Sequence, residues 1–203
     1  CLTILNSNDA DNGAKGFAQT LQAYCLMRVL NLTDTNGARL NYDGDINVDV
    51  ATKAEVLAEI ESLLDAGLSN LQSAESSFSF TLSSGFDSFN TPATFAHFNR
   101  GLRARIAVLQ DDWIAAQTAL TSCADWMNSS DDDMGVYHVF SSGANDGDNQ
   151  MYEASDAATI KLMVHPSYLT DAESGDTRLT SNVVVRSDTI KYDGLESYLA
   201  PTV

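Results

Sequence analysis

Apolar side chains recur at three- and four-residue steps in three stretches of the chain, the spacing that places them on one face of an α-helix. The stretches are residues 14–30, 52–71 and 95–124. The second has the clearest start, because Thr52 and Glu55 can cap each other's backbone N–H groups. The pattern predicts two long helices followed by a third helical region.

The apolar face predicted for the first helix contains six side chains: Phe17, Leu21, Tyr24, Cys25, Met27 and Leu30. The three cysteines of the chain have neither metal-type spacing nor the density of a disulfide framework. We therefore expect Cys25, and Cys123 in the third region, to be buried free thiols.

The stretch 95–124 is typical of two short helices folded back on each other across Asp111 and Asp112. Small residues let the helices approach closely, and Trp113 is expected to fill the wedge between them. The spaced apolar positions are Ala104, Ala107 and Val108, then Trp113, Ala116, Leu120 and Cys123. This pattern resembles a tetratricopeptide-type hairpin, a unit of about 34 residues, with Asp111 in place of the usual glycine.

The connection 72–92 is rich in serine and carries four phenylalanines: Phe78, Phe80, Phe86 and Phe89. They either pin the connection onto the core, the more common behaviour of large apolar groups, or cover a binding surface. The last third of the chain has strand-like pieces at 136–140, 182–186 and 189–192 between turn-rich segments.

These elements predict a mostly α fold of tetratricopeptide-like helical hairpins with an irregular, loop-rich, partly β face. We expect a single domain portion over 1–203, with a helical hairpin core at 1–127 and a loop-rich part at 128–203.

The charge is strongly negative, with 11 Lys and Arg against 28 Asp and Glu, a net of −17. Such a surface repels phosphate backbones and excludes nucleic acid as a natural partner. The acidity either serves solubility or suits a neutral ligand, a cationic ligand or Ca²⁺. The oxygen-rich runs 131–133 and 145–148 lack the ligand spacing of an EF-hand, which favours surface turns over a calcium site.

Catalytic motifs are missing from the sequence. It holds no metalloprotease His pair, nucleophile elbow, phosphate-binding loop or dinucleotide fingerprint, and its carboxylates are too many for one pair to stand out. We predict no catalytic residues. Trp126, Tyr137 and Tyr152 lie near polar loops, where flat aromatic rings suit the apolar faces of sugars. We take these three as candidate ligand-binding residues, with core packing as the alternative.

The order of the pieces resembles the SusD/RagB family of bacterial nutrient-uptake lipoproteins. The resemblance rests on AKGFAQTLQAYCLMRVL, on EVLAEIESLLDAGLSNL, on the helix with Arg103 and Arg105 before the Asp112-Trp113 turn, and on VHPSYLTDAESGDTRL with Asp176 and Arg178. It covers most of the chain, and it assigns no ligand residue by position, because the family has no fixed ligand motif.

The resemblance implies a non-enzymatic protein on the surface of a Gram-negative outer membrane. It implies a lid on a SusC-type TonB-dependent transporter that captures a glycan or other nutrient. Because family members are longer, the chain looks like an internal portion, so we expect the lipid anchor outside it rather than on Cys1.

Two alternatives remain open. A tetratricopeptide-type scaffold in an extracellular assembly suits the helix pairs equally well and predicts a helix-lined groove, whereas nutrient binding predicts a cleft built from loops. A glycoside hydrolase would need two carboxylates in one cleft.

Overall fold

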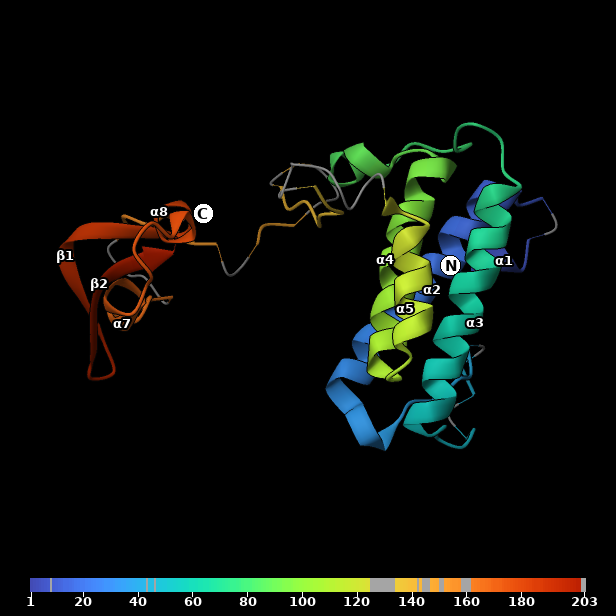
Figure 1. The fold of residues 1–203 in the computed structure, drawn as a ribbon, viewed down its shortest axis with the longest axis horizontal. Coiled ribbons are helices and arrows are strands. Elements are labelled where there is room, and N and C mark those ends of the chain that lie inside the picture. The colour runs from blue at the N-terminus through green and yellow to red at the C-terminus, as the bar shows by residue number, and fades with distance from the viewer. Residues whose placement is uncertain are drawn as a thin grey trace. The chain divides into compact units, whose positions relative to one another are not determined.

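The computed structural model describes residues 1–7, 9–42, 44–45, 47–124, 134–141, 143, 147–149, 152–157 and 162–201. Among them the fold is mostly α, with about 52% helix and a two-stranded sheet, so the predicted class is confirmed. The chain forms two compact units, Cys1–Val139 and Phe140–Val203 (Figure 1). The expected single domain, with parts at 1–127 and 128–203, stays a prediction, and each unit is described by itself.

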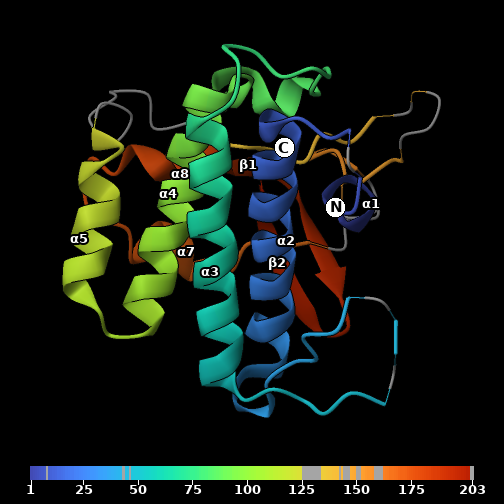
Figure 2. The ribbon, with the colours of Figure 1, turned by 90° about the vertical axis from the view of Figure 1, so that its right-hand side faces the viewer.

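In the first unit, each long helix packs against the next one along the chain (Figure 2). α2 (Asn12–Thr33) packs on α3 (Lys53–Gln72), α3 on α4 (Pro92–Leu109), and α4 on α5 (Trp113–Thr121). The unit also contains α1 (Leu2–Leu5) and the 3₁₀ turns η1 (Asp34–Asn36) and η2 (Ser84–Phe89). The three predicted helical regions are thus confirmed, while the tetratricopeptide-like and SusD-like detail stays a prediction.

Side-chain caps fix where these helices begin. At the start of α3, the Thr52 amide donates to Glu55 Oε2 at 2.8 Å and the Glu55 amide to Thr52 Oγ1 at 3.3 Å, which is the predicted capping box. At the start of α5, Asp112 Oδ1 accepts from the Ala115 amide at 2.9 Å. Asp111 before it has φ +59°, a left-handed conformation that aspartate tolerates better than most side chains.

α2 and α3 approach closely at two glycines. A Cβ on Gly16 would lie 2.7 Å from Leu71 Cγ and 2.8 Å from the Gly67 carbonyl oxygen. A Cβ on Gly67 would lie 3.0 Å from Thr20 Oγ1. The buried face of α2 is accordingly rich in small residues and consists of Gly13, Gly16, Ala18, Thr20, Gln22, Ala23, Leu26, Met27 and Leu30.

The predicted apolar face of α2 is therefore partly wrong. Tyr24 and Cys25 are exposed, because the helix turns its small side chains toward α3 and these two lie off that face. Cys123, by contrast, is buried as predicted, and burial raises the pKa of its thiol.

The predicted role of Trp113 is also wrong. Its side chain is 64% exposed, and the small residues Ala116, Ala119 and Cys123 are the buried residues of the segment that follows the turn. Leu120, expected on the same buried stripe, is 37% exposed. Small side chains form the buried contact at this helix crossing, and the indole ring stays mostly at the surface.

A buried polar junction links α2, α3 and α4. Asn99 of α4 is fully buried, and its Nδ2 donates to Thr20 Oγ1 of α2 at 2.8 Å and to the Leu64 carbonyl of α3 at 3.0 Å. Its Oδ1 accepts from Arg100 Nε at 2.9 Å. Arg100 also forms an ion pair with Asp65 of α3 at 2.9 Å. Every polar atom of the Asn99 side chain is therefore bonded.

The phenylalanines of the connection 72–92 pack onto the core. The ring of Phe17 lies 5.7 Å from that of Phe78, 5.3 Å from that of Phe80 and 4.7 Å from that of Phe95 of α4. Phe89 is buried. The first interpretation, that these rings pin the connection, is the one the structure supports.

The second unit contains α7 (Ser167–Thr170), α8 (Thr177–Asn182) and the antiparallel strands β1 (Val183–Tyr192) and β2 (Leu195–Pro201). The strand-like pieces at 182–186 and 189–192 were correctly predicted and merge into β1, with an irregular register between Val185 and Ile190. The predicted strand at 136–140 is wrong, because this segment forms no ladder.

A small core holds the second unit together. Ile190 and Ala200 are buried, and Met163 packs against them. Ser197 Oγ donates to the Val164 carbonyl at 2.6 Å, and the Val164 amide donates to the Leu199 carbonyl at 3.1 Å. In the described parts of both units, no helix is long and apolar enough to cross a bilayer.

We predict that Gly16→Ala lowers the free energy of unfolding of the first unit by about 1–3 kcal/mol, because its methyl group would overlap the α3 backbone. Chemical denaturation measures this change. Ser69→Ala, at an exposed position of α3, is the control and should stay within about 0.5 kcal/mol of the wild type. Equal stabilities for both variants would contradict the close approach of α2 and α3.

We predict that Asn99→Ala destabilises the first unit by about 2–4 kcal/mol, since it removes the hydrogen bonds of Asn99 to Thr20 and the Leu64 carbonyl and leaves Arg100 Nε without its acceptor. Asn31→Ala removes an exposed amide from α2 and should change stability by less than about 0.5 kcal/mol. If the denaturation curves of Asn99→Ala and Asn31→Ala coincide, the buried polar junction does not contribute to the stability of the first unit.

Candidate functional site

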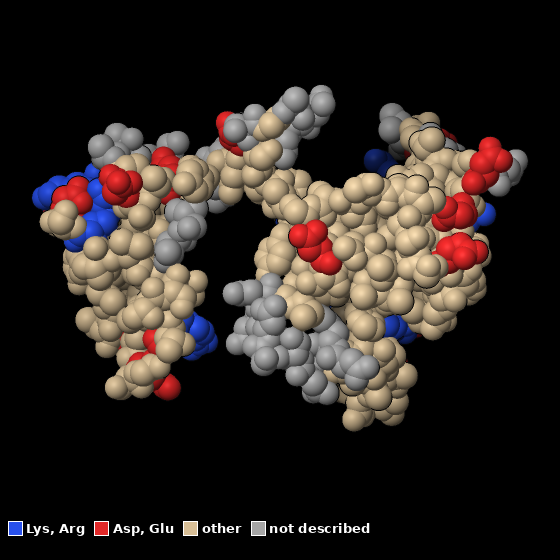
Figure 3. All heavy atoms as spheres, turned by 90° about the horizontal axis from the view of Figure 1, so that it is seen from above, with Lys and Arg blue, Asp and Glu red and all other residues tan. Residues whose placement is uncertain are grey.

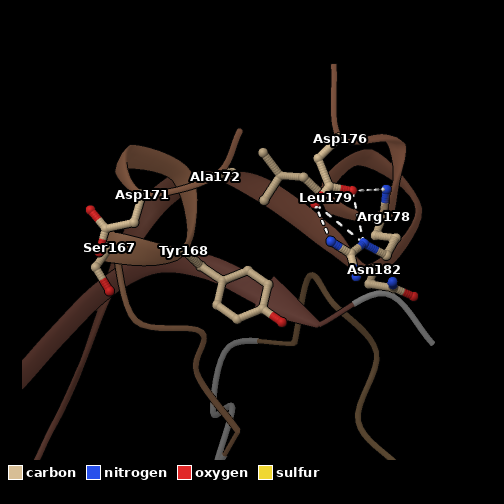
Figure 4. Close-up of a pocket in the computed structure, with 8 residues that line it drawn as sticks. All are labelled: Ser167, Tyr168, Asp171, Ala172, Asp176, Arg178, Leu179 and Asn182. Carbon is tan, nitrogen blue, oxygen red and sulfur yellow. Dashed lines mark hydrogen bonds and ion pairs between the residues drawn. The ribbon is translucent and has the colours of Figure 1, made fainter. Parts of the chain in front are cut away.

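The turn and two short helices before β1 enclose a pocket of about 390 Å³ (Figure 4). The pocket lies within the segment VHPSYLTDAESGDTRL and just after it, so chain neighbours build it. Its lining consists of Ser167, Tyr168, Asp171, Ala172, Asp176, Arg178, Leu179 and Asn182. We call it the Tyr168 pocket.

Local hydrogen bonds shape the walls of the pocket. Asp176 is the N-cap of α8, and its Oδ1 accepts from the Arg178 amide at 3.0 Å. Gly175, immediately before it, has φ +91°, which a residue with a side chain rarely adopts. On the other wall, His165 Nδ1 and Ser167 Oγ are hydrogen-bonded at 2.8 Å.

Asp176 and Arg178 form a bidentate ion pair on one side of the pocket. Arg178 Nε lies 3.0 Å from Asp176 Oδ1, and Arg178 Nη2 lies 2.7 Å from Asp176 Oδ2. The hydrogen bond from this guanidinium lowers the pKa of Asp176, and the carboxylate raises the pKa of Arg178. The Arg178 side chain is nevertheless 84% exposed, so it can still contact a ligand.

Tyr168 presents its ring between the two sides of the pocket. In Figure 4 the ring lies between Ser167 and Asp171 on one side and Arg178 and Asn182 on the other. Tyr168 is 60% exposed, which leaves much of its surface open to solvent. Asp171 accepts a hydrogen bond from the Thr170 hydroxyl at 3.0 Å.

This lining suits a small, polar ligand with an apolar face. The volume falls in the range of small-molecule pockets. An exposed aromatic ring offers a flat apolar surface, while guanidinium, carboxylate and amide groups around it can bond to hydroxyls. A sugar ring combines these two kinds of surface.

The predicted ligand residues do not meet in one described site. Trp126 lies outside the described residues. Tyr137 belongs to the first unit, is 54% exposed, and its amide donates to the Gly85 carbonyl at 2.9 Å. Tyr152 belongs to the second unit, is 58% exposed, and lines a separate hollow of about 610 Å³ with Phe140 and Asp148.

Sequence reasoning missed Tyr168 and Asp171. A usable signal was present, because both lie in the segment already singled out for Asp176 and Arg178.

The calcium hypothesis also stays a prediction. Residues 131–133 and 144–146 lie outside the described part of the chain. Within that part, no group of three or more His, Cys, Asp or Glu side chains is placed to hold a metal ion. On the face seen in Figure 3, carboxylates stand in separate small groups, some beside Lys or Arg and others among uncharged side chains.

Comparisons of the chain with protein-family models, with curated proteins and with solved structures found no match.

We predict that Arg178→Gln raises the pKa of Asp176 toward the ordinary aspartate value, because the guanidinium that favours the charged carboxylate is lost. Carboxyl chemical shifts followed by NMR over pH measure this change. Since the folded-state pKa is lowered, the ion pair adds stability above the ordinary aspartate pKa and loses it as pH falls through the lowered value.

Asp188 provides the matched control, since Arg186 lowers its pKa in the same way. Its pKa should respond to Arg186→Gln and not to Arg178→Gln. If Arg178→Gln leaves the pKa of Asp176 unchanged, the ion pair between the two residues does not form in solution.

Proposed function

We propose that this chain captures a glycan without cleaving it, at the cell surface of a Gram-negative bacterium. In this proposal it acts as the lid partner of a SusC-like TonB-dependent outer-membrane transporter. Attachment to the membrane is through a lipid anchor outside this chain.

The Tyr168 pocket is the observation that supports glycan binding. An exposed ring flanked by an arginine and two aspartates supports recognition of a sugar by stacking and by hydrogen bonds to its hydroxyls. The pocket is built from a turn and two short helices rather than from loops alone.

The ionised state of Asp176 bears on the choice between binding and hydrolysis. A two-carboxylate glycosidase needs one carboxylic acid that is protonated near neutral pH and donates to the leaving oxygen. The Arg178 guanidinium lowers the pKa of Asp176 and keeps it ionised, so it is unsuited to that role. An ionised Asp176 could still serve as the nucleophile or base of such an enzyme, so the proposal of capture rather than catalysis rests on the resemblance to the SusD/RagB family.

The transporter and the outer-membrane location rest on the resemblance to the SusD/RagB family. The order of the two long helices, the hairpin of α4 and α5 and the Asp176–Arg178 segment supports that part of the proposal. Lid opening and closing would then deliver the captured nutrient to the barrel.

A second candidate function is a protein-interaction scaffold, and one surface favours it. Trp113 and Ile114 of α5 are 64% and 80% exposed, and Val108 and Leu120 near them are partly exposed. Val108, Trp113 and Leu120 line a mostly apolar hollow of about 470 Å³ between α4 and α5. Exposed apolar surface of this kind is typical of sites that bind another protein.

Titration calorimetry against a glycan panel tests the binding part. We expect Tyr168→Ala to weaken binding of the recognised glycan by at least about tenfold, since it removes the stacking surface. Tyr137→Ala and Tyr152→Ala are the comparison variants. Loss of affinity in these two, with Tyr168→Ala unaffected, would instead support the residues predicted from sequence.

Purification of the native protein in mild detergent tests the partner. A stoichiometric TonB-dependent barrel in the preparation is the expected result. Recovery of filament or surface-layer components without a barrel would support the scaffold function and contradict the uptake proposal.

A further inference from the structure

The two aspartates of the Tyr168 pocket differ in how their charge is balanced. Asp176 is neutralised by the bidentate contact with Arg178. Among the described residues, Asp171 has no ion-pair partner, and its carboxylate accepts a hydrogen bond from the neutral hydroxyl of Thr170 at 3.0 Å. The pocket therefore carries one uncompensated negative charge.

The aromatic ring adds to the attraction for a cation. The face of a tyrosine ring is the negative end of its quadrupole and attracts an ammonium group within about 6 Å of its centre. Tyr168 lies between Asp171 and the Asp176–Arg178 pair, with more than half of its surface exposed (Figure 4). In that view the Asp171 carboxylate and the Arg178 guanidinium lie on opposite sides of the ring, and all three residues line the pocket.

The net charge of the whole chain also favours a cationic ligand. With a net charge of −17, the protein disfavours anionic ligands at long range and attracts cationic ones. A uronic acid or sulfated sugar would have to overcome this repulsion and could gain only from an arginine that is already engaged by Asp176.

We propose that the Tyr168 pocket selects sugars that carry a free, protonated amino group. The ammonium lies against Asp171 and the ring of Tyr168, and the sugar hydroxyls bond to Arg178 and Asn182. This inference rests on the proposed glycan capture and names its substrate class as amino sugars, rather than neutral, N-acetylated or acidic ones.

The test compares three trisaccharides of similar size by calorimetric titration of the full chain, at a pH where the amine is protonated. These are a β-1,4-linked glucosamine trimer, its N-acetylated form and the corresponding glucose trimer. We expect the free-amine trimer to bind at least about tenfold more tightly than the other two, since a charge-assisted hydrogen bond replaces a neutral one. This preference should shrink as ionic strength rises.

Two variants, each of which removes one negative charge, distinguish attraction by the pocket from attraction by the net charge of the chain. Asp171→Asn should weaken binding of the free-amine trimer by about tenfold and abolish the preference. Asp193→Asn removes the same charge from the β1–β2 turn, outside the pocket, and should leave the preference unchanged. Equal losses in the two variants would overturn the proposal, because the attraction would then be non-specific.

The remaining outcomes are also decisive. Equal affinity for the free-amine and glucose trimers overturns the amino-sugar inference and leaves glycan capture standing. Absence of binding for any glycan on the panel rejects the proposed function itself. Tighter binding of a lysine tripeptide, lost in Asp171→Asn, would overturn the inference in favour of a basic peptide ligand.

Discussion

The first unit depends on one buried amide. Asn99 bonds to groups on α2 and α3 and to the neighbouring Arg100, and it can do so only because the two partner helices come close enough. Gly16 and Gly67 provide that approach, since a methyl group on either would meet backbone or polar atoms at 3.0 Å or less. A fully bonded buried amide specifies one arrangement of the helices, because shifted arrangements would leave its donors and acceptors unpaired.

The same junction influences the surface. Arg100 and Arg103 are buried and form ion pairs with Asp65 and Glu61, so two of the chain's few cations are used inside the helical unit. Asp65 and Glu61 are themselves partly exposed, so these pairs neutralise two carboxylates at the edge of the helical unit. The same two arginines therefore contribute both to helix packing and to the charge balance of the helical unit.

Features that depend on neighbouring residues, such as the helix caps, were predictable from the sequence. The packing of one helix against another was not. The caps at Thr52 and Asp112 depend on residues three apart, and the phenylalanines of the connection 72–92 are too apolar to stay in water. Tyr24 and Trp113 are large and apolar but exposed, because the helix crossings bury small residues instead. Tyr168 was missed because its role depends on how two short helices fold around a turn, which no periodicity encodes.

If the Tyr168 pocket binds the proposed ligand, the small core of the second unit couples that binding to folding. A lone two-stranded hairpin is marginal in water, and here the described apolar support comes from a few residues, Ile190, Leu199, Ala200 and Met163. A ligand at about 100 times its dissociation constant adds about 2.7 kcal/mol to the state that binds it. For a unit with so few buried apolar residues, that increment is a large share of its free energy of unfolding. A ligand bound in the pocket would therefore also stabilise the folded state of the second unit.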